Sequence, residues 1–464
     1  MPKCASICFV LFSGLTILLN FSPAEARTEA RRYAIVVENG GFNTGSDTEG
    51  WLSVLNQLKS KYNARVFWFE GPADKSQPLK RGLSAYKPYY VCFITRPDHC
   101  DEDYVQSVIR LMESIDDDPY DDAIWAILTG YDYRDALRIV KAGPLTVRRE
   151  LSHLGNGWMD PWIESGVSFN EGVQGSKFIK EKGKSTAAVA GPADTTAEWV
   201  RYLNHNDCDV IVTSGHATEF DWRLGYAYKD GKIIPADRGR LKGVDLNNCT
   251  YEITTTNPKI YYGPGNCLIA HIPAKTMECM ALSWIHNGAN QFYGHIEPQY
   301  RNCTAWGVWN YFATLRGAFT FAEAVYANRV ASRYLVKSCW TGEVQAQSER
   351  CLGITVLYGD PAWAARVKKV AAPDYEMKLT TVKSGTDFCE ITACLQTNND
   401  LKFNPQYSKP PVFLLPFRIR DWKIKSTDFE TVEVTDNFIL ADTLGRTFRK
   451  GELLRIVVDC RIDD

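Results

Sequence analysis

The sequence predicts an α/β fold with a parallel sheet flanked by helices in two halves, followed by a C-terminal β-sandwich domain. Apolar strands alternate with amphipathic helices from Tyr33 to about residue 128, and this alternation starts again near Thr195. Beyond about Ala372, apolar residues instead recur at every second position. We therefore expect a signal peptide at 1–26, an N-terminal α/β subdomain at 27–190, a catalytic α/β subdomain at 191–370 and an Ig-like β-sandwich at 371–464.

The first half begins with a predicted strand at 33–37 and a helix in which Trp51, Val54, Leu55 and Leu58 recur at helical spacing. Further strands are predicted at 66–69, 89–94 and 123–128, with an amphipathic helix around 105–112. The stretch 143–191 is richer in Gly, Ser and charged residues, and we interpret it as a connection between the two halves.

The second half begins with a helix at 195–203, capped by Asp194 or Thr195, and a strand at 209–213 that ends at Ser214-Gly215-His216. A loop is expected from there to about residue 260. The segment 260–272, a helix at 276–287 and a strand at 291–295 then continue the alternation.

The N-terminus has the features of a cleavable signal peptide. Lys3 precedes an apolar run at 5–19, and Ala24-Glu25-Ala26 fits a small-x-small cleavage site before Arg27. No later apolar stretch reaches the roughly 18 residues of a membrane span, so no membrane insertion is expected after cleavage. The sequence predicts a protein that is secreted, periplasmic or on the cell surface.

Composition excludes several classes of function. The net charge of -2 and the absence of a long basic block argue against nucleic acid as a partner. No HExxH motif or CxxC pair is present, so we predict neither a metal nor another cofactor. Four residues that could suggest a metal are interpreted as packed side chains: His271, Cys279, His286 and His295. Some cysteines can pair in an oxidising compartment, but the sequence does not give their connectivity.

Two residues combine the chemistry of a nucleophile and a base. His216 and Cys267 each follow a buried strand of the same predicted sheet, where open α/β folds place reactive groups. A thiol becomes nucleophilic near neutral pH when an imidazole accepts its proton. The histidine precedes the cysteine by 51 positions, which is the order and spacing of the caspase signature.

Several segments resemble clan CD cysteine peptidases, the group of caspases, legumains and gingipains. Val210–Ala217 resembles the strand that ends in His-Gly in that group, and Asn266–Ala270 is similar to its nucleophile turn. The stretch from Glu278 to His295 and the tripeptide Gly359-Asp360-Pro361 resemble the gingipain branch. The likeness spans about 33–363 and implies a caspase/gingipain-like fold and an exported cysteine endopeptidase that acts on proteins or peptides.

The resemblance also implies roles for individual residues. Cys267 would attack the carbonyl and His216 would transfer the proton, while the backbone N–H groups of Cys267 and Ala217 would hold the oxyanion. Asp135 could orient the imidazole, although an acid there could equally cap a helix. Glu297 and Trp306 are candidates for the substrate pocket, with a solvated loop acid as the alternative for Glu297.

The sequence departs from the family pattern, since Ala217 replaces a Gly and Asn266 occupies a position usually held by a small apolar residue. A second hypothesis is therefore an inactive relative that acts as a secreted or cell-surface binding module. A third is another acyl-transfer enzyme that uses the same pair.

Overall fold

The computed structural model describes residues 31–42, 47–155, 159, 162–205, 208–299, 303–369, 372–384, 387–403 and 409–463. The predicted signal peptide and its cleavage site at Ala26 lie outside these residues. Within them, no helix combines the length and the apolar character that crossing a membrane requires.

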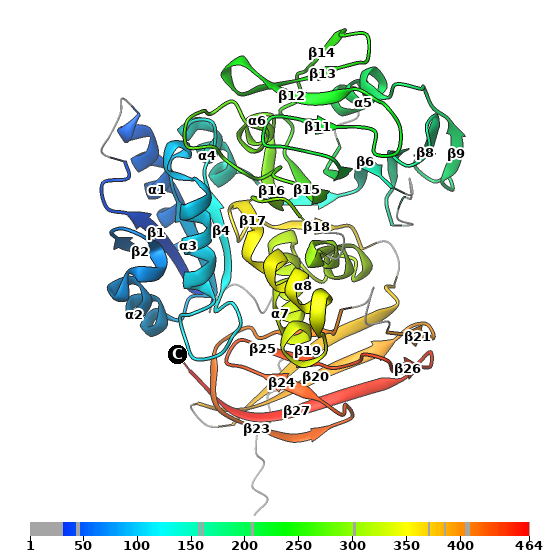
Figure 1. Cartoon of the computed structure of the whole chain (residues 1–464). Helices are drawn as coiled ribbons and strands as arrows, with labels where there is room; N and C mark the ends of the chain where they lie inside the picture. Colours follow the sequence, from blue (N-terminus) through cyan, green and yellow to red (C-terminus); the bar gives the residue numbers. More distant parts are fainter. Residues whose placement is uncertain are drawn as a thin grey trace, which may run out of the picture.

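The described residues build one large sheet whose strands come from both halves of the chain (Figure 1). In spatial order the strands are β2 (Arg65–Phe69), β1 (Tyr33–Glu38), β3 (Tyr90–Ile94), β4 (Ile124–Leu128), β17 (Thr355–Gly359), β16 (Ala289–His295), β15 (Lys259–Asn266), β10 (Val210–Gly215), β6 (Arg149–Leu154), β7 (Ser165–Asn170), β8 (Ser176–Lys180) and β9 (Ala187–Ala190). Strands β1, β3 and β4 are almost wholly buried, which explains their continuous apolar sequences.

The strand directions reverse where the two halves meet. Strands β2, β1, β3, β4 and β17 are mutually parallel, and so are β16, β15, β10, β6 and β7. Between the two sets, β16 and β17 pair antiparallel. The carboxyl ends of the second set therefore lie at the opposite edge of the sheet from those of the first set. The predicted fold class is confirmed, with this reversal as a detail that the alternation of strands and helices did not predict.

Two stretches differ from the prediction. The connection expected at 143–191 instead supplies β6, β7, β8 and β9, which extend the sheet beyond β10. Polar residues hid these strands, because Ser152, His153 and Ser168 are buried where apolar residues would be expected. The loop expected between His216 and residue 260 contains a small antiparallel sheet of β11 (Trp222–Arg223), β12 (Lys232–Ala236), β13 (Arg240–Val244) and β14 (Thr250–Ile253).

Helices pack against the large sheet and bury the residues that define their apolar faces. The helices are α1 (Thr48–Tyr62), α2 (Gln77–Tyr86), α3 (Glu102–Met112), α4 (Tyr133–Lys141), α5 (Thr196–His205), α6 (Met280–His286), α7 (Phe321–Ser338) and α8 (Gly342–Ile354). Helix α1 buries Trp51, Val54, Leu55 and Leu58, as its spacing predicts. Helix α7 begins at a capping box formed by Thr320 and Glu323, which satisfies backbone donors at a buried helix end.

The C-terminal part consists of antiparallel sheets, as the period-two pattern predicts, and lies beneath α7 and α8 in Figure 1. Its strands are β19 (Tyr375–Ser384), β20 (Phe388–Thr397), β27 (Leu453–Ile462) and β23 (Ile419–Thr427) in one sheet, β22 (Val412–Leu414), β25 (Phe438–Ala441) and β24 (Val432–Val434) in a second, and β21 (Leu401–Lys402) with β26 (Thr447–Phe448) in a third. A parallel pair, β5 (Leu145–Val147) and β18 (Ala365–Val367), lies within the α/β part.

Buried hydrogen bonds join the C-terminal sheets to the α/β part. The guanidinium of Arg418 is buried, pairs with Asp436 and donates to the backbone oxygens of Pro88 and Asp122. Independent folding of the C-terminal part stays a prediction.

Candidate active site

The parallel pairing of β10 and β15 brings the two predicted reactive residues to the same edge of the sheet. The register pairs Gly215 with Asn266, so His216 and Cys267 are the next residues to leave two neighbouring strands. Such strands lie about 4.8 Å apart. Cys267 is half-buried, whereas His216 is exposed and its ring lies on that of Tyr226, with centroids 5.0 Å apart. A thiol and an imidazole are therefore presented together to solvent.

Two glycines allow the strand ends to approach this closely. Gly215 has a φ of 89°, which only glycine adopts without strain. A Cβ at Gly265 would lie 2.4 Å from that of Ser214 and 3.0 Å from the indole of Trp306. A side chain at Gly265 would therefore clash with Ser214 on the neighbouring strand.

The side chain of Asn266 links strands β10 and β15 through hydrogen bonds. Its Oδ1 accepts a hydrogen bond from Thr213 Oγ1, and its Nδ2 donates to the backbone oxygen of Gly215 at 3.2 Å. The side chain is fully buried, so its polar atoms depend on these partners. A residue that departs from the family pattern in the sequence thus has a structural role in aligning the site.

The chain turns sharply immediately after Cys267. Leu268 has a φ of 53°, a left-handed conformation that costs a non-glycine residue roughly 1–3 kcal/mol. The thiol lies beside the segment that follows β16, because Cys267 Sγ accepts a hydrogen bond from the Gln299 N–H at 3.4 Å. Gln299 Nε2 in turn donates to the backbone oxygen of Gly265 at 3.0 Å. This turn leaves Cys267 partly exposed at the strand end, with its thiol against Gln299.

The Ala217 N–H is positioned to act as a donor. Ala217 forms a bridge with Trp222 whose two hydrogen bonds are made by neighbours: the Arg223 N–H donates to His216 O and the Thr218 N–H donates to Asp221 O. The bridge therefore leaves the Ala217 N–H unused. Because His216 O is held on one side of the His216–Ala217 peptide, the N–H points to the other side.

Asp135 lies elsewhere. Its Oδ2 contacts His286 Nδ1 at 3.0 Å and accepts from the Tyr131 N–H at 3.1 Å. His286 ends α6, just before β16 begins, which is the edge of the sheet where β15 also begins. The eight residues of β15 separate that edge from Cys267, a rise of about 26 Å. The structure does not bring Asp135 to His216, because the reversal between β16 and β17 sends the carboxyl end of β4 to the opposite edge.

Glu171 is a carboxylate at the correct edge that the sequence analysis missed. It directly follows β7, it is 4% exposed, and its Oε1 accepts from Ser214 Oγ. A Cβ at Gly215 would lie 2.6 Å from Glu171 Oε2, which has no hydrogen-bond partner among the described residues. Burial raises its pKa to about 7. The alternation in Gly166-Val167-Ser168-Phe169 could have revealed β7 and placed this acid at the end of a strand.

The raised pKa of Glu171 predicts how stability depends on pH. The unfolded chain loses this proton near pH 4.3 and the folded chain near pH 7, so the stability contributed by the protonated carboxyl is lost as pH rises through that window. We expect Glu171→Gln to be more stable than wild type at pH 8 by about 1–3 kcal/mol, with little difference at pH 4. Urea denaturation at the two pH values measures this, and an equal difference at both would contradict the assignment.

The two candidates for the substrate pocket differ in their surroundings. Glu297 is already paired, because Arg350 Nη2 donates to Oε2 at 2.7 Å and Gln106 Nε2 donates to Oε1 at 2.9 Å. Trp306 is 41% exposed and its indole packs over Gly265, two residues before the thiol. Of the two, Trp306 presents an unengaged surface beside the reactive residues.

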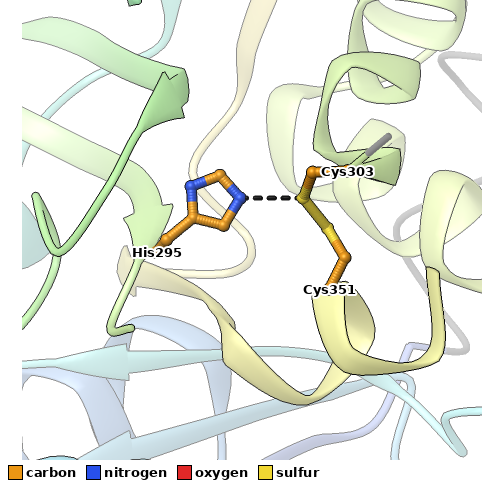
Figure 2. A group of neighbouring side chains, drawn as sticks. All are labelled: His295, Cys303 and Cys351. Carbon is orange, nitrogen blue, oxygen red and sulfur yellow. Dashed lines mark hydrogen bonds between the residues drawn. A yellow bond between two sulfur atoms is a disulfide. The ribbon is translucent and has the colours of Figure 1, made fainter. Parts of the chain in front are cut away.

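One group of described residues has metal-ligand geometry. His295, Cys303 and Cys351 place their ligand atoms within 4.8 Å of one another (Figure 2). Both sulfurs are joined in a disulfide, so neither offers the thiolate that a metal would need. The other residues first compared with a metal site are dispersed: His271 Nδ1 contacts Ile296 O, and His286 pairs with Asp135.

No family model matches the chain, and neither does any curated protein. Two solved structures are similar to it. The first is the Arg-specific cysteine proteinase gingipain R, with a TM-score of 0.43, 10% identity, and coverage of 96% of this chain and 100% of that one. The second is a complex of Porphyromonas gingivalis RgpB pro- and mature domains, with a TM-score of 0.45, 8% identity, and coverage of 93% and 100%. Because both TM-scores are below 0.5 and identity is low, this likeness assigns no activity to the chain.

Proposed function

We propose that the chain is a cysteine endopeptidase in which Cys267 is the nucleophile and His216 the general base. The observation that supports this most is the register of β10 and β15, in which a half-buried thiol and an exposed imidazole directly follow the paired residues Gly215 and Asn266. Two backbone N–H groups, those of Cys267 and Ala217, lie in the same strand ends and complete the set of groups that acyl transfer requires.

The reaction follows from these groups. Cys267 Sγ bonds to the carbonyl carbon of the peptide while its proton passes to His216, and the carbonyl oxygen becomes an oxyanion held by the two N–H groups. The C–N bond then breaks and the leaving amine takes the proton from His216. Water, deprotonated by His216, attacks the thioester, which releases the carboxylic acid and restores the thiol.

The proposed mechanism sets a condition on His216. Its imidazole stacks on Tyr226, and the role of general base requires the ring to lie within hydrogen-bond reach of Cys267 Sγ during the reaction. Trp306, which covers Gly265, is proposed to contact the substrate beside the scissile bond. The substrate class is protein or peptide. Export by the segment at 1–26 is part of the proposal, and a mature chain that still carries these residues would contradict it.

A peptide-library digestion combined with site-resolved alkylation tests the proposal. We expect the protein that begins at Arg27 to cleave peptides, and we expect iodoacetamide to modify Cys267 faster than the exposed Cys249 and Cys339. The excess rate at Cys267 should disappear in His216→Ala, since the thiol then loses its base. Cys249→Ala is the matched control and should change neither result. Absence of both cleavage and fast alkylation would favour the inactive binding module instead.

A further inference from the structure

Each proposed oxyanion donor belongs to a peptide whose carbonyl oxygen has a hydrogen-bond partner, and the two partners differ in kind. The Ala217 N–H belongs to a peptide whose carbonyl, His216 O, accepts from the backbone of β11 at 2.9 Å. The Cys267 N–H belongs to a peptide whose carbonyl, Asn266 O, lies 3.0 Å from Nδ1 of His295. A side chain thus contacts the carbonyl of the peptide before Cys267, whereas a backbone N–H contacts the carbonyl of the peptide before Ala217.

The protonation of His295 follows from its neighbours. Asn266 O can only accept a hydrogen bond, so Nδ1 must carry a proton and donate it. Complete burial lowers the pKa of His295 to about 4, which keeps the ring neutral at physiological pH and leaves Nε2 without a proton. The ring therefore has one proton, and that proton is directed at the peptide before Cys267.

The disulfide fixes the other side of the ring. Nε2 of His295 lies 3.0 Å from Sγ of Cys303, whose bond to Cys351 is drawn in Figure 2. A disulfide sulfur has no proton to donate and accepts hydrogen bonds only weakly, so the carbonyl oxygen of Asn266 is the stronger acceptor for the single ring proton. The bond also joins Cys303, which lies in the segment after β16, to Cys351 on α8. The ring is confined between a carbonyl and a covalent cross-link.

We propose that His295 is a positioning residue that holds the Asn266–Cys267 peptide so that the Cys267 N–H faces the oxyanion. The peptide group is planar and the described chain contains no cis bond, so fixing the carbonyl direction fixes the N–H direction on the opposite side. This inference rests on the proposed function, because it concerns the orientation of a donor used only during acyl transfer. His295 itself touches neither substrate nor reacting atoms.

Two substitutions separate this role from simple packing. Asparagine places its side-chain NH₂ where Nδ1 of histidine lies, so His295→Asn keeps a donor toward Asn266 O. His295→Leu fills similar space without a donor. We expect His295→Leu to lower kcat on the cleaved peptide roughly 10- to 100-fold, and His295→Asn to remain within about fivefold of wild type.

A second readout isolates the oxyanion. Alkylation of Cys267 by iodoacetamide needs the thiolate but forms no oxyanion, so its rate should stay within about threefold of wild type in both variants. Thermal melts of both variants accompany the kinetics. Should His295→Leu fail to fold, His295→Gln replaces it, because glutamine places its amide near Nε2 and leaves Asn266 O without a donor.

The outcomes are distinguishable. A wild-type protein without turnover contradicts the proposed function, and the inference falls with it. A wild-type protein that turns over, together with a donor-less variant of unchanged kcat, contradicts the role of His295 alone. A parallel loss of kcat and alkylation in both the donor-less and asparagine variants would also overturn it, since a structural defect would affect both reactions.

Discussion

Cys267→Ala should abolish peptide turnover, with a loss of roughly a thousandfold or more, because the proposed acyl intermediate forms on Cys267 Sγ. His216→Ala should retain the thiol but leave it mostly protonated near neutral pH. The double variant should resemble the worse single variant, since residues that act as one catalytic unit are strongly non-additive. Steady-state kinetics on the peptide selected from the library measures all three.

The folding of these variants is the control. Cys267 is half-buried and His216 is exposed, so neither substitution should move the thermal midpoint by more than a few degrees. Near-normal turnover by Cys267→Ala would show that Cys267 is a structural thiol. Unfolding of Cys267→Ala would place this thiol in the core and remove the proposed active site as well.

The largest loss of stability is expected from Arg329→Leu. This buried arginine on α7 donates to Asp121 beside β4 at 2.5 Å and to Glu113 after α3 at 3.0 Å. Without it, Asp121 remains buried without its guanidinium partner, which typically costs about 3–5 kcal/mol, whereas Glu113 keeps its ion pair with Arg333 at 2.6 Å. Urea denaturation measures the loss.

An exposed ion pair supplies the matched comparison. Arg134 pairs with Asp132 at 2.8 Å, but its side chain is 72% exposed, so Arg134→Leu should cost less than about 1 kcal/mol. Changing Asp121 to Asn in the Arg329→Leu background should recover part of the stability, because a neutral amide is less costly to bury than an unpaired carboxylate. Equal losses from Arg329→Leu and Arg134→Leu would contradict the importance of burial.

The placement of His216 and Cys267 at the ends of neighbouring strands was predictable from sequence, because both residues directly follow apolar strands. The strand ending at Gly215 and the one ending at Asn266 have near-continuous buried sequences, and strands of that kind adjoin others of the same kind. Glu171 was not predictable in the same way, because it follows β7, whose neighbour β6 buries Ser152 and His153. His153 Nε2 contacts Thr195 Oγ1 at 3.3 Å, a partner 42 positions away that the local sequence does not identify.

The position of Asp135 depended on strand direction. Its sequence correctly indicates the end of a strand and the start of a helix, since Asp132 caps α4 by accepting from the Arg134 N–H. Which edge of the sheet that end occupies is decided by the antiparallel pairing of β16 with β17, strands that lie some sixty residues apart. Local periodicity carries no information about the relative direction of strands that are so distant in sequence.

By itself, the sequence determined the fold class, the buried faces of the main helices and the two residues that end adjacent strands, because periodicity and strand termination are local properties of the chain. Only the tertiary structure decided which carboxylate lies beside Gly215, which side chain contacts the carbonyl of Asn266, and which cysteines are joined. Each of these depends on contacts between segments brought together by strand order and register, and such contacts are set by the packing of the whole sheet rather than by neighbouring residues.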